Sequence, residues 1–262
     1  MPLENTGNRV VDIQYVKDIA TIYLENGKEI TSSNDVLLDN LVYIGKILSD
    51  EEIAIIIESS SYDECLKKSL KLVSRYVYTN EQLKNKLLTK YSIITVKKVL
   101  DYLEENNLLD DDLYIKDYVF FGNSKLWGKD KIISKLLEKG IDREKIKETY
   151  FPRSIEKNKI ESLMKSLESK YQNYNSHQKK EHIYVSLLRN GYEHDLIDEA
   201  LENLKGSDDY SLLVNDYIKI KEKVERKYDD YKARQNIVGY LLQKGYNYSD
   251  IKKIMEDDEN DD

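Results

Sequence analysis

The residues whose types could do chemistry gather in one short segment around the only tryptophan of the chain. Lys125, Trp127, Lys129 and Lys131 lie close together, with Gly128 between them. Lysine ammonium groups contact phosphates, and an exposed aromatic ring stacks on a base or packs against a protein. The segment is therefore a candidate partner-binding site. The favoured interpretation is plainer: a loop and a first helical turn, with Trp127 packed between neighbouring repeats.

A second run of cations lies near the carboxyl-terminal end. It is diluted by acids such as Glu222 and Glu225. A solvated helix with ion pairs along its own surface is the favoured interpretation, and a stripe that follows phosphates is the alternative. The candidate partner-binding residues of this run are Lys219, Lys223, Arg226, Lys227 and Arg234.

The other reactive residue types form no constellation with a known chemistry. The 3 histidines, His177, His182 and His194, have no cysteine near them, and the first two are poorly spaced for one helix face. Cys65 is best explained as a small core residue. No glycine-rich loop has the spacing that cradles phosphates. We therefore expect no catalytic residue, no metal and no cofactor, and an enzyme is the least favoured class.

Composition indicates a folded protein with a hydrophobic core. The chain has 262 residues, of which 40% are hydrophobic, with a net charge of −8. That charge argues against general coating of nucleic acid, which needs an excess of cations. The single cysteine favours a reducing compartment. No stretch approaches the length of a membrane helix and no signal peptide is visible, so we expect a cytoplasmic protein, and a monomer.

A sequence motif that recurs along the chain indicates which helices position these residues. Leu-Leu pairs begin at residues 87, 136, 187 and 241, a period of about 50 residues that is typical of helical repeats. An aliphatic residue stands four positions before each pair, on the same helix face; these are Leu83, Ile132, Ile183 and Ile237.

Glycines follow three of the four pairs and predict helix ends in the left-handed conformation. They are Gly140, Gly191 and Gly245, whereas the first copy has Tyr91 there and runs one residue out of step. A further apolar segment closes each unit: residues 114–121, 160–167 and 212–220. The pattern predicts units of three helices that begin with the Leu-Leu helix, with the fourth unit cut short after two.

The first 60 residues differ from the rest. Alternating β-branched residues predict strands at 9–16 and 19–24 and a third from residue 29, and Asn26-Gly27 predicts a hairpin between the last two. Helices near 34–41 and 50–58 would cover the sheet. Capping boxes are predicted at three helix starts, namely Ser49 with Glu52, Ser61 with Glu64, and Thr79 with Gln82.

These signals divide the chain into five parts. The expected fold is mainly α: a small β-rich module followed by tandem three-helix repeats in a curved array. The expected ranges are 1–60 for the β-containing module, 61–122, 123–174 and 175–224 for three repeats, and 225–262 for a partial fourth repeat. The last residues, 256–262, are acidic and are expected to be solvated and frayed.

The order and spacing of these motifs resemble the RecX family, the bacterial regulators of the RecA recombinase. From residue 125 to 141 the chain reads KLWGKDKIISKLLEKGI, which is similar to the family pattern Lys-x-x-Gly-Lys-x-x-Ile-x-x-x-Leu-x-x-Lys-Gly-Ile. Residues 103–114 resemble the helix end and acidic turn that precede it, and residues 45–49 resemble part of the amino-terminal module of longer members. Tyr91, and Asn190 before Gly191, depart from the pattern at helix ends.

The resemblance covers nearly the whole chain and implies a function. A RecX-like protein would lie along the groove of the RecA filament on single-stranded DNA, bridge protomers and oppose filament growth. It would hinder ATP hydrolysis and the coprotease activity of the SOS response, and so modulate recombination and DNA repair. The expected partner is the RecA filament, with weak direct DNA contact as an addition and no membrane.

Two other classes stay open. Three-helix units also resemble helix-turn-helix modules, so a nucleic-acid-binding regulator is the main alternative. It would show a contiguous basic face and a steep dependence on salt when it binds DNA alone. A general protein-binding scaffold is the third possibility.

Overall fold

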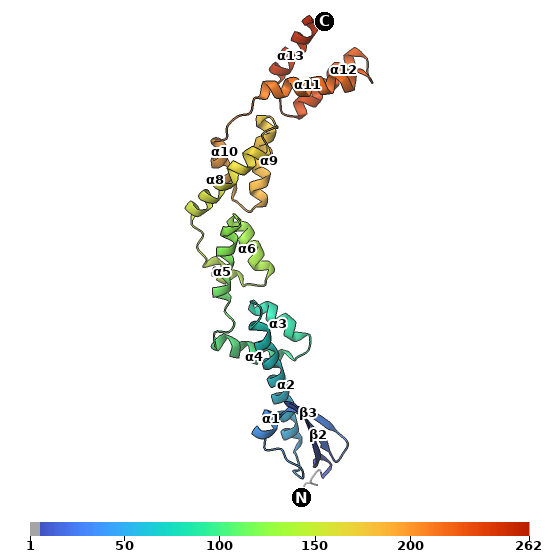
Figure 1. Cartoon of the computed structure of the whole chain (residues 1–262), viewed down its shortest axis with the longest axis vertical. Coiled ribbons are helices and arrows are strands. Elements are labelled where there is room, and N and C mark those ends of the chain that lie inside the picture. Colours follow the sequence, from blue (N-terminus) through green and yellow to red (C-terminus); the bar gives the residue numbers. More distant parts are fainter. Residues whose placement is uncertain (1–5, 262) are drawn as a thin grey trace. The chain divides into compact units, whose positions relative to one another are not determined.

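The computed structural model describes residues 6–261 (Figure 1). The chain falls into two compact units. The first unit comprises Met1–Lys116 and Leu136–Ile146, and the second comprises Asp117–Lys135 and Lys147–Asp262. Each unit is described by itself. Most of the described residues are helical, and the strands are confined to the amino-terminal part.

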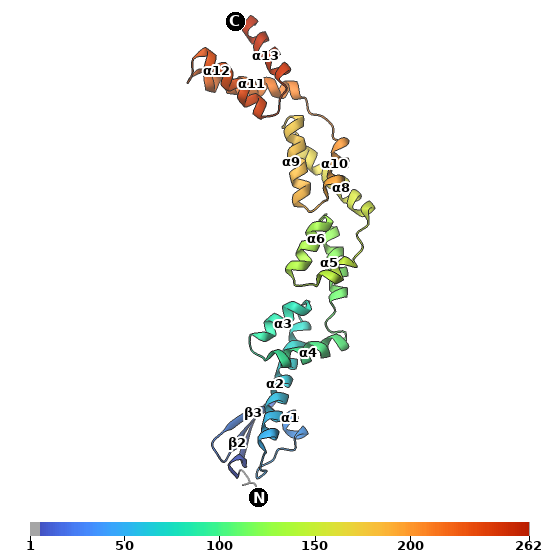
Figure 2. The same ribbon diagram turned by 180° about the vertical axis from the view of Figure 1, so that it is seen from behind.

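A three-stranded antiparallel sheet opens the first unit. Its strands are β1 (Val10–Val16), β2 (Ile19–Leu24) and β3 (Glu29–Ser33), in the order β1-β2-β3, preceded by a 3-10 turn at Thr6–Asn8. One face of the sheet is covered by α1 (Asn34–Asp39) and α2 (Asp50–Val73), as both views show (Figures 1 and 2). The shared core contains Ala20, Ile22 and Ile30 from the sheet and Ile53 and Ile56 from α2. The predicted sheet and its two covering helices are confirmed.

The two hairpins turn through left-handed residues. Lys17, between β1 and β2, has φ 57°, and Gly27, between β2 and β3, has φ 81°. Asn26 keeps a negative φ, and its side chain accepts a hydrogen bond from the backbone N–H of Lys28. The Asn-Gly pair therefore makes the predicted hairpin with one left-handed residue instead of two, because the loop is longer than two residues.

Helix α2 contradicts the predicted boundary at residue 60. It runs without a break from Asp50 to Val73, so Ser61 lies inside a helix and the capping box with Glu64 is wrong. The capping boxes at Ser49 with Glu52 and at Thr79 with Gln82 are both present. The first half of α2 packs on the sheet and its second half contributes Cys65 to another core. One continuous helix therefore serves two cores, which local capping signals do not reveal.

The remaining helices follow in a regular order. They are α3 (Asn80–Leu88), α4 (Ile93–Glu105), α5 (Asp111–Ser124), α6 (Lys129–Glu138), α7 (Arg143–Lys147), α8 (Arg153–Lys170), α9 (Ser176–Arg189), α10 (His194–Glu202), α11 (Asp209–Glu225), α12 (Asp230–Gln243) and α13 (Tyr248–Asp261). The Leu-Leu helices are α3, α6, α9 and α12. In each of them the first leucine of the pair is completely buried and the second is at least partly exposed.

Buried clusters group these helices in threes, but in a different phase from the one expected. One core joins α2, α3 and α4, another joins α8, α9 and α10, and a third joins α11, α12 and α13. The Leu-Leu helix is thus the middle helix of its module. The helix expected to close a unit packs with the next Leu-Leu helix, so the last module has all three helices and is not cut short. The expected boundary between 175–224 and 225–262 separates α11 from α12 and α13, although these three helices share one core.

The acidic end of the chain also differs from expectation. Helix α13 continues to Asp261, so residues 256–261 extend a helix and are not frayed. Asp258 accepts hydrogen bonds from the Tyr217 hydroxyl at 2.7 Å and from Lys221 Nζ at 2.5 Å. The Lys221 ammonium holds the pKa of the Asp258 carboxyl below its usual range. These contacts fasten α13 to α11. Nowhere in residues 6–261 does a helix combine the length and the apolar character needed to cross a membrane.

Candidate partner-binding surface

Consecutive modules are joined at three places by a hydrogen bond between equivalent positions of the repeat. The residue directly before a Leu-Leu helix donates to a backbone carbonyl at the end of the following Leu-Leu helix. Thr79 Oγ1 donates to Lys139 O at 2.6 Å, Gly128 N to Asn190 O at 2.8 Å, and Asn175 Nδ2 to Lys244 O at 2.8 Å. The donors differ chemically, yet each reaches the residue that precedes a repeat glycine. We call these three contacts the joints.

A second contact recurs at every joint. The first backbone N–H of the Leu-Leu helix donates to an acid in the first turn of the next module's first helix. The pairs are Asn80 N to Asp111 Oδ1 at 2.9 Å, Lys129 N to Glu156 Oε2 at 3.0 Å, and Ser176 N to Asp209 Oδ1 at 2.7 Å. A helix start has unpaired N–H groups and a positive dipole end, so a carboxylate from the next module stabilises both.

The repeat glycines are required by these joints. Gly140, Gly191 and Gly245 have φ of 81°, 83° and 88°. A Cβ added at Gly191 would lie 2.3 Å from the backbone N of Lys131, and one at Gly245 would lie 2.2 Å from Cδ2 of His177. The glycines therefore serve both the left-handed helix end, as predicted, and the close approach of the preceding Leu-Leu helix.

Tyr91 shows why the first copy departs from the pattern. It is buried in the core of its own module, as Tyr192 and Tyr246 are in later copies. Its backbone N–H bonds to Leu87 O, the ordinary helical partner, without a left-handed residue before it. One residue is missing there relative to the other copies, which explains the shift in step that places Val96 in the core.

The predicted basic and aromatic segment belongs to the second joint. Lys129 Nζ is 3.0 Å from Glu193 Oε1, and this hydrogen bond raises the pKa of Lys129. Lys131 Nζ donates to Asn190 Oδ1 at 3.1 Å and lies 5.0 Å from the centre of the Trp127 ring. Both ammonium groups therefore have partners within the chain.

Trp127 is half-buried in a cluster of rings at the end of α5. Its ring centre lies 5.6 Å from that of Phe121 and 6.4 Å from that of Tyr118, and Lys125 Nζ lies 5.7 Å from the centre of Phe121. The structure thus brings Lys125, Trp127 and Lys131 to one aromatic cluster and directs Lys129 elsewhere. This arrangement favours the packing interpretation of the segment, and its role in binding a partner stays a prediction.

A buried polar network beneath this segment was not predicted. Lys159 and Glu156 form an ion pair at 2.5 Å with only 5% and 6% of their side chains exposed. Lys159 Nζ also donates to Asn123 Oδ1 at 2.8 Å and to Trp127 O at 2.6 Å. A buried charge needs such partners, because removal from water is costly. The Glu-Lys spacing of three along α8 was the only signal in the sequence, and it is common on exposed helices.

Tyr192 completes the network. Its hydroxyl donates to Leu126 O at 2.8 Å, and Leu126 has φ 55°. Burial raises the pKa of the Tyr192 hydroxyl, so it stays protonated and able to donate at neutral pH. The loop between α5 and α6 is thus fixed on both sides, by Lys159 and by Tyr192.

The second predicted run of cations is arranged differently. Lys219, Lys223, Arg226 and Lys227 are exposed. Lys219 and Lys223 lie four residues apart on one face of α11, Arg226 is the C-cap of that helix, and Lys227 lies in the turn that follows it. Within residues 6–261 these four side chains have no carboxylate at ion-pair distance. We call them the α11 stripe. Only Lys221, between them, shows the expected intrahelical pair, at 4.0 Å from Glu225. Arg234 is exposed on α12 and is not part of the stripe.

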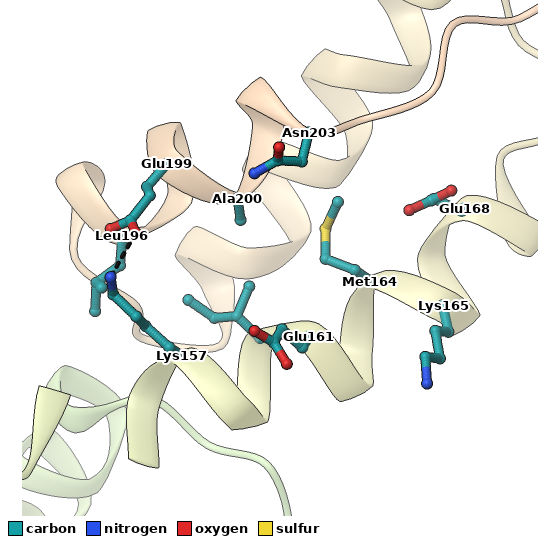
Figure 3. A pocket seen from close by; sticks show the side chains of 10 residues that line it. Lys157, Glu161, Met164, Lys165, Glu168, Leu196, Glu199, Ala200 and Asn203 are labelled. Atoms are coloured by element: carbon teal, nitrogen blue, oxygen red, sulfur yellow. Dashed lines mark hydrogen bonds and ion pairs between the residues drawn. The ribbon is translucent and has the colours of Figure 1, made fainter. Parts of the chain in front are cut away.

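A shallow groove lies between α8 and α10 (Figure 3). It has a volume of about 400 Å³, with Ile160, Met164, Leu196 and Ala200 among its lining. An ion pair between Lys157 and Glu199 closes one end. No histidine, cysteine or hydroxyl group is among its lining residues. The described residues also contain no group of three or more histidine, cysteine or acidic side chains placed to hold a metal ion.

Comparison with known proteins agrees with this architecture. Residues 208–255, which span α11, α12 and most of α13, match the family model "RecX, third three-helix domain". That span begins at α11, as the buried core does. "Regulatory protein RecX" of Streptococcus agalactiae serotype Ia is 25% identical over 94% of this chain and 98% of its own length. The protein of the same name from Clostridium tetani is 28% identical over 79% of this chain and 100% of its own.

Two solved structures share the fold. A crystal structure of regulatory protein RecX matches with a TM-score of 0.61 and 22% identity, over 74% of this chain and 99% of that one. A crystal structure of RecX from Lactobacillus salivarius matches with a TM-score of 0.53 and 22% identity, over 56% and 97%. The resemblance seen in the sequence, the matched helical domain and these relatives agree, and together they support the RecX family.

Proposed function

We propose that this protein regulates the RecA recombinase by binding RecA filaments on single-stranded DNA, chiefly as an inhibitor. The family name of its relatives, regulatory protein RecX, supports a regulatory role. The observation that carries the proposal is the α11 stripe: four exposed cations without carboxylate partners, inside the segment that matches the family model. A filament of protein and DNA offers acidic side chains and phosphates to such a face.

The modular build supports the same partner. Modules that follow one another through equivalent joints can each make a modest contact with successive subunits of a polymer. Linked contacts gain affinity because each later contact forms at a high effective concentration. The net charge of −8 opposes binding to bare DNA as a whole, so the protein subunits would supply most of the affinity.

Inhibition follows from bridging. A protein that spans neighbouring RecA subunits holds their relative positions, and it therefore opposes the rearrangements that accompany ATP hydrolysis. The same occupancy would obstruct growth of the filament and access of a repressor to be cleaved. No step in this proposal requires a reaction catalysed by the chain itself, so the role is that of a binding protein and not of an enzyme.

Hydrolysis of ATP by RecA from the same organism, stimulated by single-stranded DNA, tests the proposal. Addition of this protein below the RecA concentration should lower the rate and shorten the filaments. The variant K219A/K223A/R226A/K227A should require a markedly higher concentration for the same effect. The matched control is K71A/K97A/K116A/K165A, which removes the same charge from exposed helical lysines elsewhere. An unchanged rate at every concentration of the wild-type protein would sink the proposal.

A nucleic-acid-binding regulator is the second candidate, and the α11 stripe is again the observation that favours it. Two cations on one face of α11 and two more at its carboxyl-terminal end could contact a DNA backbone. Binding to bare duplex DNA should then weaken steeply as salt rises, with a slope close to the number of phosphates contacted. Tight, salt-sensitive binding to duplex DNA, together with no effect on RecA, would move the assignment to this class.

A further inference from the structure

A second aromatic and cationic surface lies on α9 and on the turn after α8, apart from the residues considered so far. The ring of His182 stacks on that of Tyr171, with centres 5.1 Å apart and planes 18° apart. Tyr174 meets both rings edge to face, at 4.6 Å from His182 and 5.8 Å from Tyr171. His182 is exposed, and Tyr174 has 39% of its surface exposed. The three rings therefore form a small platform that solvent reaches.

Cations surround this platform. Lys170 Nζ lies 4.9 Å from the centre of the Tyr171 ring, and Lys180 and Arg189 line the same hollow of about 770 Å³ as Tyr171 and His182. Within the part of the chain that the structure describes, Lys170, Lys180 and Arg189 have no carboxylate at ion-pair distance. Two acids also line the hollow: Asp198, and Glu181, which lies 3.8 Å from His177. Cations therefore outnumber acids around the rings.

The platform is held in place before any ligand arrives. The Tyr171 hydroxyl and the Ser186 hydroxyl lie 3.2 Å apart, and the nearby Tyr184 hydroxyl lies 2.5 Å from Nδ1 of His194. The Ser186 and Lys170 contacts lower the pKa of the Tyr171 hydroxyl. Rings fixed in this way lose little conformational freedom when a ligand stacks on them.

We propose that Tyr171, Tyr174 and His182, with Lys170, Lys180 and Arg189, form a binding site for single-stranded nucleic acid. Unpaired bases stack on the ring platform and the neighbouring phosphates contact the three cations. Single strands fit better than a duplex, whose base faces are covered by their neighbours. They also fit better than an acidic peptide, which would use the cations and leave the rings without a role. The inference deepens the proposed function by naming the residues that contact DNA, but the site can exist without RecA.

Fluorescence anisotropy of a labelled oligothymidylate at low salt, with the full chain and no RecA, tests the site. H182A and Y174A should each weaken binding about fivefold or more, since a stacked base is worth about 1–3 kcal/mol by alanine substitution. Y174F keeps the ring and should bind as the wild type does. K180A and R189A should each reduce the dependence on salt by about one phosphate contact. K165A, an exposed lysine on α8 outside the site, is the matched control.

Four results would each contradict the proposed binding site. These are no binding of the oligothymidylate by the wild type at low salt, equal binding by H182A, equal affinity for a duplex of the same length, or equal competition by polyglutamate. Circular dichroism of each variant shows whether its helices are intact. The RecA assay separates the two proposals: the wild type can fail to affect RecA and still bind the oligonucleotide here, in which case only the regulatory proposal falls. Loss of oligonucleotide binding in H182A with RecA regulation kept would leave both standing as separate activities.

Discussion

At the residue scale, Gly191 is the most constrained position of the second joint. Its backbone has φ 83°, and it accommodates the backbone of Lys131 where a side chain would stand. The sequence was sufficient to predict the left-handed helix end, because glycine directly after a periodic apolar helix has that role. It did not reveal the second role, since the approaching helix begins about 60 residues earlier in the chain and no local pattern records the contact.

Replacing Gly191 with alanine should destabilise the second joint. The left-handed conformation alone costs about 1–2 kcal/mol for a residue with a Cβ, and the added methyl group would also displace the Lys131 backbone. Gly239→Ala is the matched control, because Gly239 lies inside α12 with nothing within 4 Å of an added Cβ. That change should stabilise the helix by about 0.5–1 kcal/mol.

Urea unfolding followed by Trp127 fluorescence measures Gly191→Ala, since the only tryptophan of the chain lies beside this joint. Far-ultraviolet circular dichroism, which averages over all helices, measures Gly239→Ala. The transition should move to lower urea for Gly191→Ala. A transition in Gly191→Ala that equals the wild type would show that the joint does not hold Gly191 as described.

The candidate site residues show the same limit of prediction. Lys129 and Lys131 were recognised by type and spacing, but their partners Glu193 and Asn190 lie in another module, beyond any local pattern. The α11 stripe was more accessible to prediction, because its four cations lie close together in the sequence and the shared face of Lys219 and Lys223 depends only on helix geometry.

At the scale of elements, the sequence determined helix positions better than helix partnerships. Helical periodicity located the four Leu-Leu helices and the apolar segments between them. It did not show which helix comes first in each module, because a pattern that recurs every 50 or so residues is the same whichever helix is counted first. The buried cores resolve the phase: α11 packs with α12 and α13 through Leu213 and Tyr217. Continuity of α2 was hidden for a similar reason, since serines inside a helix resemble capping residues.

Proline at Ser61 should uncouple the two cores that α2 joins. Proline within a helix removes a hydrogen bond and clashes with the preceding turn, at a cost of about 3 kcal/mol or more. Ser61→Ala keeps the helix and is the control. Loss of helical circular dichroism and a lower melting temperature are expected for Ser61→Pro alone. Equal melting of the two variants would mean that α2 is already broken near residue 61.

At the scale of the whole molecule, the protein is a chain of modules with separate cores joined by short polar contacts. Stability in such proteins is the sum of the modules' own stabilities and the interfaces between neighbours. A single cooperative transition is therefore not expected, even though each module is small enough to unfold as a unit.

Two probes of urea unfolding should consequently give different midpoints. Trp127 fluorescence reports on the second joint, whereas far-ultraviolet circular dichroism averages over all helices and should change over a broader range of urea. Coincident curves from the two probes would contradict the modular description and indicate one cooperative body.

Tyr91 has a consequence for how copies of this protein meet one another. The start of one Leu-Leu helix can pack closely against the end of another only where that end has a left-handed glycine. The end of α3 has no such glycine. A second molecule that presented the start of its α12 would meet an ordinary helix end with a tyrosine directed into the core. Head-to-tail contacts that do not close into a ring generate fibres. The absence of one glycine after α3 thus disfavours a joint between two molecules, whereas the glycines of the later copies permit the joints within one molecule.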